Sequence, residues 1–98
     1  MAYTHAILTI EPRYNDKAED FAQVLRERGQ TCDVLGHNEG IHKKLDYAKE
    51  KGYDFVHVIN QLEYEINSMN VRSEKGTNVI GTVRIVDFLH RLACGKYN

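Results

Sequence analysis

The stretch that decides the fold is residues 38–72, which read NEGIHKKLDYAKEKGYDFVHVINQLEYEINSMNVR. Apolar residues recur in its first half at the spacing of one helix face, and they are Ile41, Leu45 and Ala48. Gly52 predicts the end of this helix. The run Phe55-Val56-His57-Val58-Ile59 then reads as a buried β-strand, and a turn leads into a further strand over residues 68–73. This succession of elements is typical of a small α/β sheet.

Upstream, the same alternation of strand and helix appears. Residues 6–10, AILTI, read as a buried strand that stops before Pro12. A helix follows, with Asp16-x-x-Glu19 as its predicted capping box and Gly29 past its end; its apolar face is Ala18, Phe21, Ala22 and Leu25. Residues 31–35 form a second strand. Because strands and helices alternate, we expect three parallel strands joined by right-handed crossovers.

Downstream, the pattern changes to a hairpin. Residues 68–73 and 77–81 flank Glu74-Lys75-Gly76, which places glycine at the turn. Thr82 is the predicted cap of a last helix, whose core side carries Ile85, Val86, Phe88, Leu89 and Leu92. The prediction is an α/β fold in a single domain, residues 1–98, with a mixed five-stranded sheet and three helices.

Composition excludes several classes of protein. Thirteen Lys and Arg against fourteen Asp and Glu give a net charge of −1, which argues against strong non-specific binding to polyanions. The apolar runs are too short to span a bilayer, and the N-terminus has no secretion signal. Two cysteines, Cys32 and Cys94, do not make a disulfide framework. We expect reduced thiols and a cytoplasmic location.

Three side chains form the leading candidate site, and they are Asn38, Glu63 and Arg72. Arginine offers a fork of donors, asparagine offers both donor and acceptor, and glutamate accepts from base amines, so the set suits the edges of nucleobases. The structural alternative is an ion pair between Glu63 and Arg72, with Asn38 capping the second helix. Arg13 and Tyr14, in the loop after the first strand, either clamp and stack on a base or belong to a solvated loop.

The second helix carries four lysines on its predicted outer face: Lys43, Lys44, Lys49 and Lys51. They either meet phosphates or, together with the acidic residues among them, form an ordinary solvated face. The histidine and cysteine spacing does not make a zinc site, and neither a phosphate-binding loop nor a nucleophile with a base is present. We therefore expect no metal, no cofactor and no enzymatic activity.

Several motifs match a known family in order and spacing. They are Ala22-x-x-Leu25-x-x-x-Gly29, Asn38-Glu39-x-Ile41, Lys43-Lys44, Val58-Ile59-x-x-x-Glu63-x-Glu65, and Val71-Arg72. From about Ala6 to Leu92 the chain resembles the anticodon-binding domain of class II aminoacyl-tRNA synthetases of the histidyl, glycyl, threonyl and prolyl type, with spacing most like the threonyl one. The resemblance implies a three-layer α/β/α unit with strand order 2-1-3-4-5 and strand 4 antiparallel. It also implies anticodon contacts at Asn38, Glu63 and Arg72, with the loop at Arg13 near the RNA.

The leading hypothesis is therefore a freestanding, non-catalytic RNA-binding module that recognises a tRNA anticodon or a similar RNA hairpin. The alternative is a protein-interaction or dimerisation module that kept the fold but lost RNA, which the near-neutral charge and Glu74 in the hairpin favour. A third hypothesis, small-molecule binding at the carboxyl ends of the parallel strands, follows from the general α/β rule alone.

Overall fold

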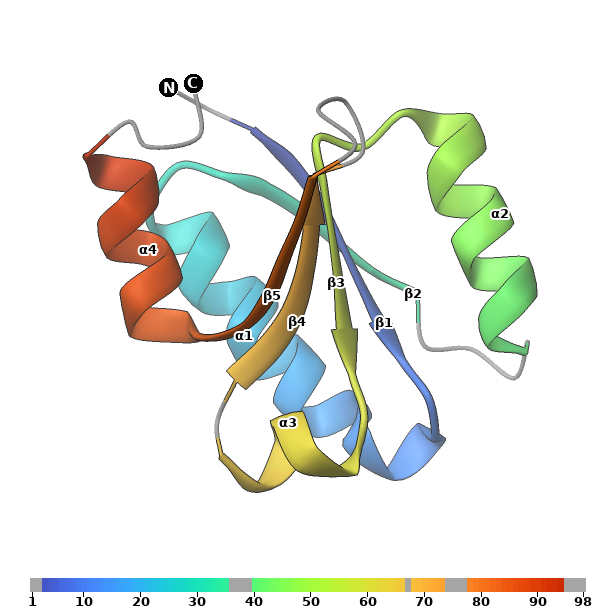
Figure 1. Cartoon of the computed structure of the whole chain (residues 1–98). Helices are drawn as coiled ribbons and strands as arrows, with labels where there is room; N and C mark the ends of the chain where they lie inside the picture. The colour runs from blue at the N-terminus through green and yellow to red at the C-terminus, as the bar shows by residue number, and fades with distance from the viewer. Residues whose placement is uncertain (1–2, 36–39, 67, 74–77, 95–98) are drawn as a thin grey trace.

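The computed structural model describes residues 3–35, 40–66, 68–73 and 78–94. Five strands form one sheet in the order β2-β1-β3-β4-β5 (Figure 1). They are β1 (Thr4–Thr9), β2 (Thr31–Leu35), β3 (Phe55–Ile59), β4 (Ser68–Ser73) and β5 (Asn78–Arg84). β1 runs parallel to β2 and β3, whereas β4 is antiparallel to both of its neighbours. The predicted order and the antiparallel fourth strand are confirmed.

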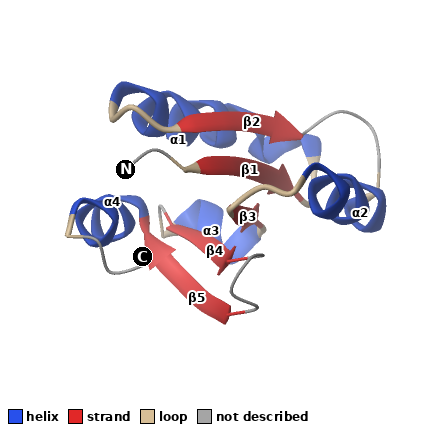
Figure 2. Cartoon of the chain, turned by 90° about the horizontal axis from the view of Figure 1, so that it is seen from above, coloured by secondary structure: helices blue, strands red, loops and turns tan. Residues whose placement is uncertain are grey.

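The helices lie on both faces of the sheet, with α1 and α4 on one face and α2 on the other (Figures 1 and 2). The helical elements are η1 (Pro12–Tyr14), α1 (Asn15–Glu27), α2 (Ile41–Lys51), α3 (Gln61–Glu65) and α4 (Ile85–Ala93), η1 being a 3₁₀ turn. This is the predicted three-layer α/β/α architecture. None of the helices within the described ranges has the length and hydropathy needed to cross a bilayer.

The core has a large half and a small half, one on each side of the sheet. Phe21 and Leu25 of α1 and Phe88 of α4 pack on the first face, around Ile7 and Phe55. On the second face, buried residues from α2 and three other segments form a smaller cluster, which consists of Ala6, Leu8, Ala48, Tyr53 and Val56. β1 and β3 are therefore covered on both faces, as expected for central parallel strands.

Two histidines sit inside the larger half of the core. His5 and His57 are fully buried, with their rings stacked 5.1 Å apart and Phe88 edge-on to both. Gln30 accepts at its Oε1 from His5 Nε2 (2.8 Å), and His5 Nδ1 lies 2.9 Å from His57 Nε2. His5 must therefore donate from Nε2 and accept at Nδ1, and His57 must donate from Nε2. Among the described residues no donor reaches His57 Nδ1, which is left as a buried acceptor.

Several local predictions are wrong, among them the place of Val86 on the core side of the last helix, since this side chain is exposed. α1 begins at Asn15 with no side-chain cap, so Asp16 and Glu19 do not form the expected capping box. The last helix begins at Ile85, and Thr82 belongs to β5, which is longer than predicted. The sequence also did not predict the short helix α3. The hairpin turn at residues 74–76 lies outside the described residues.

β5 is extended by a bulge that the pattern of residue types did not show. Val71 pairs with Gly81 and Arg72 with Val79, so Ile80 is an extra residue on β5. Gly81 has φ +94°, a conformation that glycine adopts without strain and other residues avoid. Beyond the bulge, β5 continues past the expected end of the strand and leads directly into α4.

Candidate nucleic-acid interface

The candidate interface is the edge of the sheet where β1, β2 and β3 end. η1 and α1 follow β1, α3 follows β3, and the start of α2 lies a short distance beyond β2. In Figure 1 η1 and α3 lie side by side below the ends of their strands. Ile10 N donates to Ile59 O over 3.1 Å, which joins the two segments as they leave the sheet. Parallel strands gather these loops at one edge, where α/β folds place their binding sites.

The turn after β1 is fixed by local bonds. Pro12 stands in the first turn of η1, where its fixed φ suits the start of a helix. Thr9 Oγ1, fully buried at the end of β1, donates to Asn15 Oδ1 over 2.5 Å. Asn15 is the first residue of α1, so this bond ties the strand end directly to the helix start.

α3 is held by a capping box at Asn60 and Glu63. Asn60 is the N-cap, and its side-chain oxygen accepts from Gln61 N over 2.8 Å. Glu63 Oε1 accepts in return from Asn60 N over 3.1 Å. The sequence signal was an amide residue followed three positions later by glutamate. Five residues are too few for a helical hydrophobic period, so this pattern was the one available sign of the helix.

Glu63, the first predicted base contact, faces inward. Its side chain is buried, and it stabilises the start of α3. Arg72 lies on β4, where its backbone pairs with Val56 rather than with the end of β3. Three residues separate Val56 from Ile59, about 10 Å along a strand, so the register does not bring the backbone of Arg72 next to α3. Asn38 lies outside the described residues.

Arg13 and Tyr14 occupy different environments. The Arg13 side chain is exposed; its Nη2 donates to the Tyr14 hydroxyl over 2.7 Å, and its Nε is 2.5 Å from Glu11 Oε2. Both contacts raise the pKa of Arg13, the bond to Tyr14 more strongly. Tyr14 is only 3% exposed and packs against Tyr64, so its ring does not offer an open face to a base. Tyr64 is 40% exposed and is not among the site residues predicted from the sequence.

The lysines of α2 do not share one outer face. Lys43 is exposed in the first turn, as predicted. Lys44 is buried, and its Nζ donates to Thr9 O over 3.0 Å, which corrects its expected place on the solvated side. The reason is periodicity, because position 44 is three residues after Ile41 and continues its inward row. Lys44 therefore satisfies a carbonyl at the end of β1.

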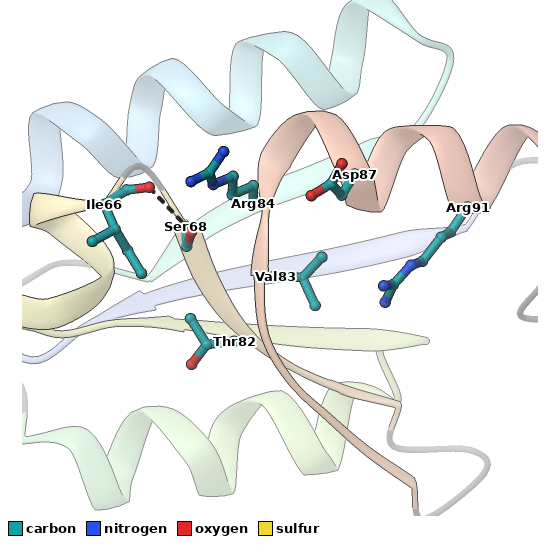
Figure 3. A pocket seen from close by; sticks show the side chains of 7 residues that line it. All are labelled: Ile66, Ser68, Thr82, Val83, Arg84, Asp87 and Arg91. Atoms are coloured by element: carbon teal, nitrogen blue, oxygen red, sulfur yellow. Dashed lines mark hydrogen bonds between the residues drawn. The ribbon is translucent and has the colours of Figure 1, made fainter.

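A hollow lies beyond the end of α3, between the start of β4, the end of β5 and α4 (Figure 3). It measures about 370 Å³ and is lined by Ile66, Ser68, Thr82, Val83, Arg84, Asp87 and Arg91. Ser68 is buried and donates to Ile66 O over 3.2 Å, which fixes the turn from α3 into β4. Two arginines and one aspartate give this hollow a polar, net cationic lining.

The remaining chemical groups of interest are the two cysteine thiols and the potential metal ligands. Burial raises the pKa of the Cys32 thiol to about 12, so this cysteine is not a nucleophile at neutral pH. Cys94 is exposed beside His90, at 3.7 Å from its Nε2. Over the described part of the chain, no three His, Cys, Asp or Glu side chains converge to hold a metal ion. Among the described residues of the carboxyl edge, no nucleophile lies beside a base in the contacts given above.

Comparison with known proteins identifies the family. A family profile described as "Anticodon binding domain" matches residues 4–94, nearly the whole chain. The chain belongs to the anticodon-binding domain family. This confirms the resemblance inferred from the motif spacing, and the matched residues include every element of the described fold.

Threonine–tRNA ligases are among the relatives of this anticodon-binding domain. It is 33% identical over 64 residues to the probable cytoplasmic threonine–tRNA ligase of Encephalitozoon cuniculi, which covers 65% of this chain and 10% of the ligase. It is 29% identical over 86 residues to the threonine–tRNA ligase of a Clostridium botulinum strain, covering 88% and 13% respectively. The domain therefore spans only about a tenth of the curated relatives that it matches.

A solved structure shows the same fold. The RNA binding domain of threonyl-tRNA synthetase from Cryptosporidium parvum superposes with a TM-score of 0.87 at 15% identity. The match covers 94% of this chain and 23% of that chain. At this identity the likeness establishes the fold alone, and the site must be argued from the residues of this chain.

Proposed function

We propose that this domain binds RNA without catalysing a reaction, and that its ligand is a tRNA anticodon loop or a similar RNA hairpin. The observation that carries the proposal is the family match over residues 4–94, taken with the side chains at the carboxyl edge. Arg13 and Lys43 stand exposed on the segments that follow β1 and β2. Unpaired loop bases expose the edges that such groups read.

The proposed contacts divide into three kinds. Asn38, Glu63 and Arg72 read base edges, Arg13 and Lys43 meet phosphates, and Tyr14 supports the base-binding surface from below. Glu63 is buried and caps α3 through one carboxylate oxygen. In this proposal it contacts a base through its other carboxylate oxygen, which does not bond Asn60. With a net charge of −1, the domain should depend on few phosphate contacts, so its affinity should fall only gently with salt.

The test is titration of anticodon stem-loop RNAs with the wild type and with Arg72→Ala. Loss of a bidentate base contact costs about 1–3 kcal/mol, and the loss should be confined to stem-loops that carry the recognised base. Arg28→Ala is the matched control: it removes the same charge from an exposed site at the opposite edge, where α1 ends. Equally weak binding of every stem-loop by wild type and both variants would refute the proposal.

The names of the related ligases bear on the cellular location of this domain and on its part in aminoacylation. The Encephalitozoon relative is named as cytoplasmic, and we propose the same location for this domain. Because the match reaches about a tenth of each ligase, we assign no aminoacylation to the residues described here. The domain supplies recognition, and any chemistry belongs to other parts of a ligase.

A second candidate function is docking to another protein or to a second copy. It is favoured by the near-neutral charge and by two exposed apolar side chains, Val86 on α4 (66% exposed) and Leu62 on α3 (58% exposed). β2 and β5 are the edge strands of the sheet, and unpaired edges can extend a sheet between molecules. A concentration-independent dimer by light scattering, with no affinity for any stem-loop, would favour this function over RNA binding.

A further inference from the structure

A hollow of about 300 Å³ opens beside α3 at the carboxyl edge, and its composition suits a flat polar ring. It is lined by Arg13, Tyr14, Gln61, Tyr64 and Glu65. The lining thus combines two aromatic rings with a guanidinium, an amide and a carboxylate. Three of these residues come from α3, and two come from η1.

Tyr64 forms an exposed aromatic wall of the hollow, and two neighbouring side chains contact its ring. Its ring centroid is 5.2 Å from that of the buried Tyr14, with the ring planes at 40°. Lys17 holds Tyr64 through two contacts, since its Nζ lies 4.8 Å from the ring centroid and donates to Tyr64 O over 3.2 Å. Lys17 is not among the residues that line the hollow. The ring is therefore braced without its ammonium partner occupying the hollow.

The rim of the hollow carries hydrogen-bonding groups in fixed positions. Gln61 Nε2 donates to Glu65 Oε1 over 3.2 Å, one helical turn along α3. A carboxylate accepts about four hydrogen bonds, so this one bond leaves Glu65 able to accept more. The Arg13 guanidinium is held by the Tyr14 hydroxyl and by Glu11. Arg13 and Glu65 bring opposite charges to the lining, so the hollow does not rely on charge alone.

We propose that this hollow takes one unpaired RNA base, stacked on Tyr64, and that Glu65 favours a base with an exocyclic amino group. Base stacking on an aromatic side chain is strong and tolerant of sequence, whereas a carboxylate accepts from amino groups such as cytosine N4. Arg13 donates to acceptors on the same base or to its phosphate. The inference rests on the proposed RNA-binding function and adds a base pocket distinct from Asn38, Glu63 and Arg72.

A fluorescent reporter tests the pocket directly, because the chain has no tryptophan. In Tyr64→Trp, the single indole should be quenched on titration with a tetranucleotide of adenine or cytosine, and less so with one of uracil. In the otherwise wild-type chain, Tyr64→Leu should weaken binding of these oligonucleotides about 5- to 150-fold. Tyr64→Phe, which keeps the ring, should bind like the wild type and shows that the position tolerates substitution.

The control variant is Tyr47→Leu. Tyr47 is 43% exposed on α2 and carries the Lys51 ammonium 5.6 Å from its ring centroid, so it resembles Tyr64 but lies outside the hollow. It should leave oligonucleotide affinity unchanged. Glu65→Gln should reduce the preference for adenine and cytosine over uracil while leaving the quenching itself. Equal affinity of wild type and Tyr64→Leu, with no quenching in Tyr64→Trp, would overturn the inference.

The outcomes separate this inference from the proposed function. Anticodon stem-loop binding that survives in Tyr64→Leu at full strength overturns the base pocket but leaves the RNA-binding proposal standing. Absence of binding to every stem-loop and tetranucleotide by the wild type overturns both. Free nucleosides form a further arm, and if adenosine binds as tightly as the adenine tetranucleotide, the hollow is a nucleoside site and not an RNA subsite.

Discussion

Mild acid should destabilise this domain because His5 and His57 are buried as neutral rings. Burial lowers the pKa of His57 well below its usual 6.5, and the neighbouring His5 adds to the effect. Burial also lowers the pKa of His5, although its bond to Gln30 and the charge of Asp54 oppose the shift. At mildly acidic pH these two histidines therefore bind protons in the unfolded chain but stay neutral in the folded chain. The contribution of the two neutral histidines to the free energy of unfolding is present above about pH 6.5 and is lost as the pH falls below that value.

The magnitude follows from the unfolded state. A histidine with a pKa of 6.5 goes from about one quarter to about nine tenths protonated between pH 7.0 and pH 5.5. If it stays neutral when folded, the free energy of unfolding falls by ~1.2 kcal/mol over this interval. His57 should contribute this full amount, and the two histidines together should contribute at most about 2.5 kcal/mol. This is a large part of the stability of a small domain.

The assay is urea unfolding followed by circular dichroism at intervals from pH 7.5 to pH 5.5, at constant ionic strength. His57→Phe keeps a flat ring between His5 and Phe88 but removes one titrating group, so the loss should fall to at most about 1.2 kcal/mol. His42→Gln and His90→Gln remove exposed histidines and should leave the loss close to that of the wild type. An unfolding free energy that stays flat to pH 5.5, or one that falls equally in wild type and His57→Phe, would refute the reasoning.

Three substitutions test the local structure, each measured by urea unfolding. Asn60→Ala removes the N-cap of α3 and should cost ~0.5–2 kcal/mol, and an unchanged midpoint would contradict the capping box. Gly52→Ala places a side chain at φ +71° and should cost about 1–2 kcal/mol, whereas Gly40→Ala, in extended backbone at the N-cap of α2, should cost less than about 1 kcal/mol, because the weaker cap is partly offset by the lower entropy of the unfolded chain. Lys44→Ala leaves a buried carbonyl of β1 without its donor and should cost about 1–3 kcal/mol, whereas its exposed neighbour Lys43→Ala should stay within about 0.5 kcal/mol; equal costs for the two would place both lysines in solvent.

Hydrophobic period was sufficient to predict most of the fold. Three strands and the three longer helices were predicted from apolar runs and i, i+3, i+4 spacing, and the last two strands were predicted from the glycine turn between them. The same period places Lys44 on the inner row of α2. The prediction nevertheless put Lys44 on the solvated face because lysine is rarely buried without a partner. Its partner is a backbone carbonyl, and a carbonyl has no sequence signature.

The boundaries failed for a different reason. Thr82 has the chemistry of a helix cap, yet it also has high strand propensity. The bulge at Gly81, with φ +94°, let β5 run on to Arg84. Which of the two roles threonine takes depends on the pairing of β5 with β4, a contact that local sequence does not encode. α3 was missed because a single helical turn is stabilised by its caps rather than by a buried face.

The candidate site was less predictable than the fold because burial, not residue type, decides which groups a ligand can reach. Tyr14 and Glu63 have the right chemistry for base recognition, but Tyr14 is the covered ring of an aromatic pair and Glu63 is the inward member of a capping box. Tyr64 is the exposed ring because it follows Glu63 by one position on α3, which turns it by about 100° around the helix axis. The capping that buries the glutamate thus directs the tyrosine outward, and a single helical turn sets both the stability of this edge and the surface that it presents.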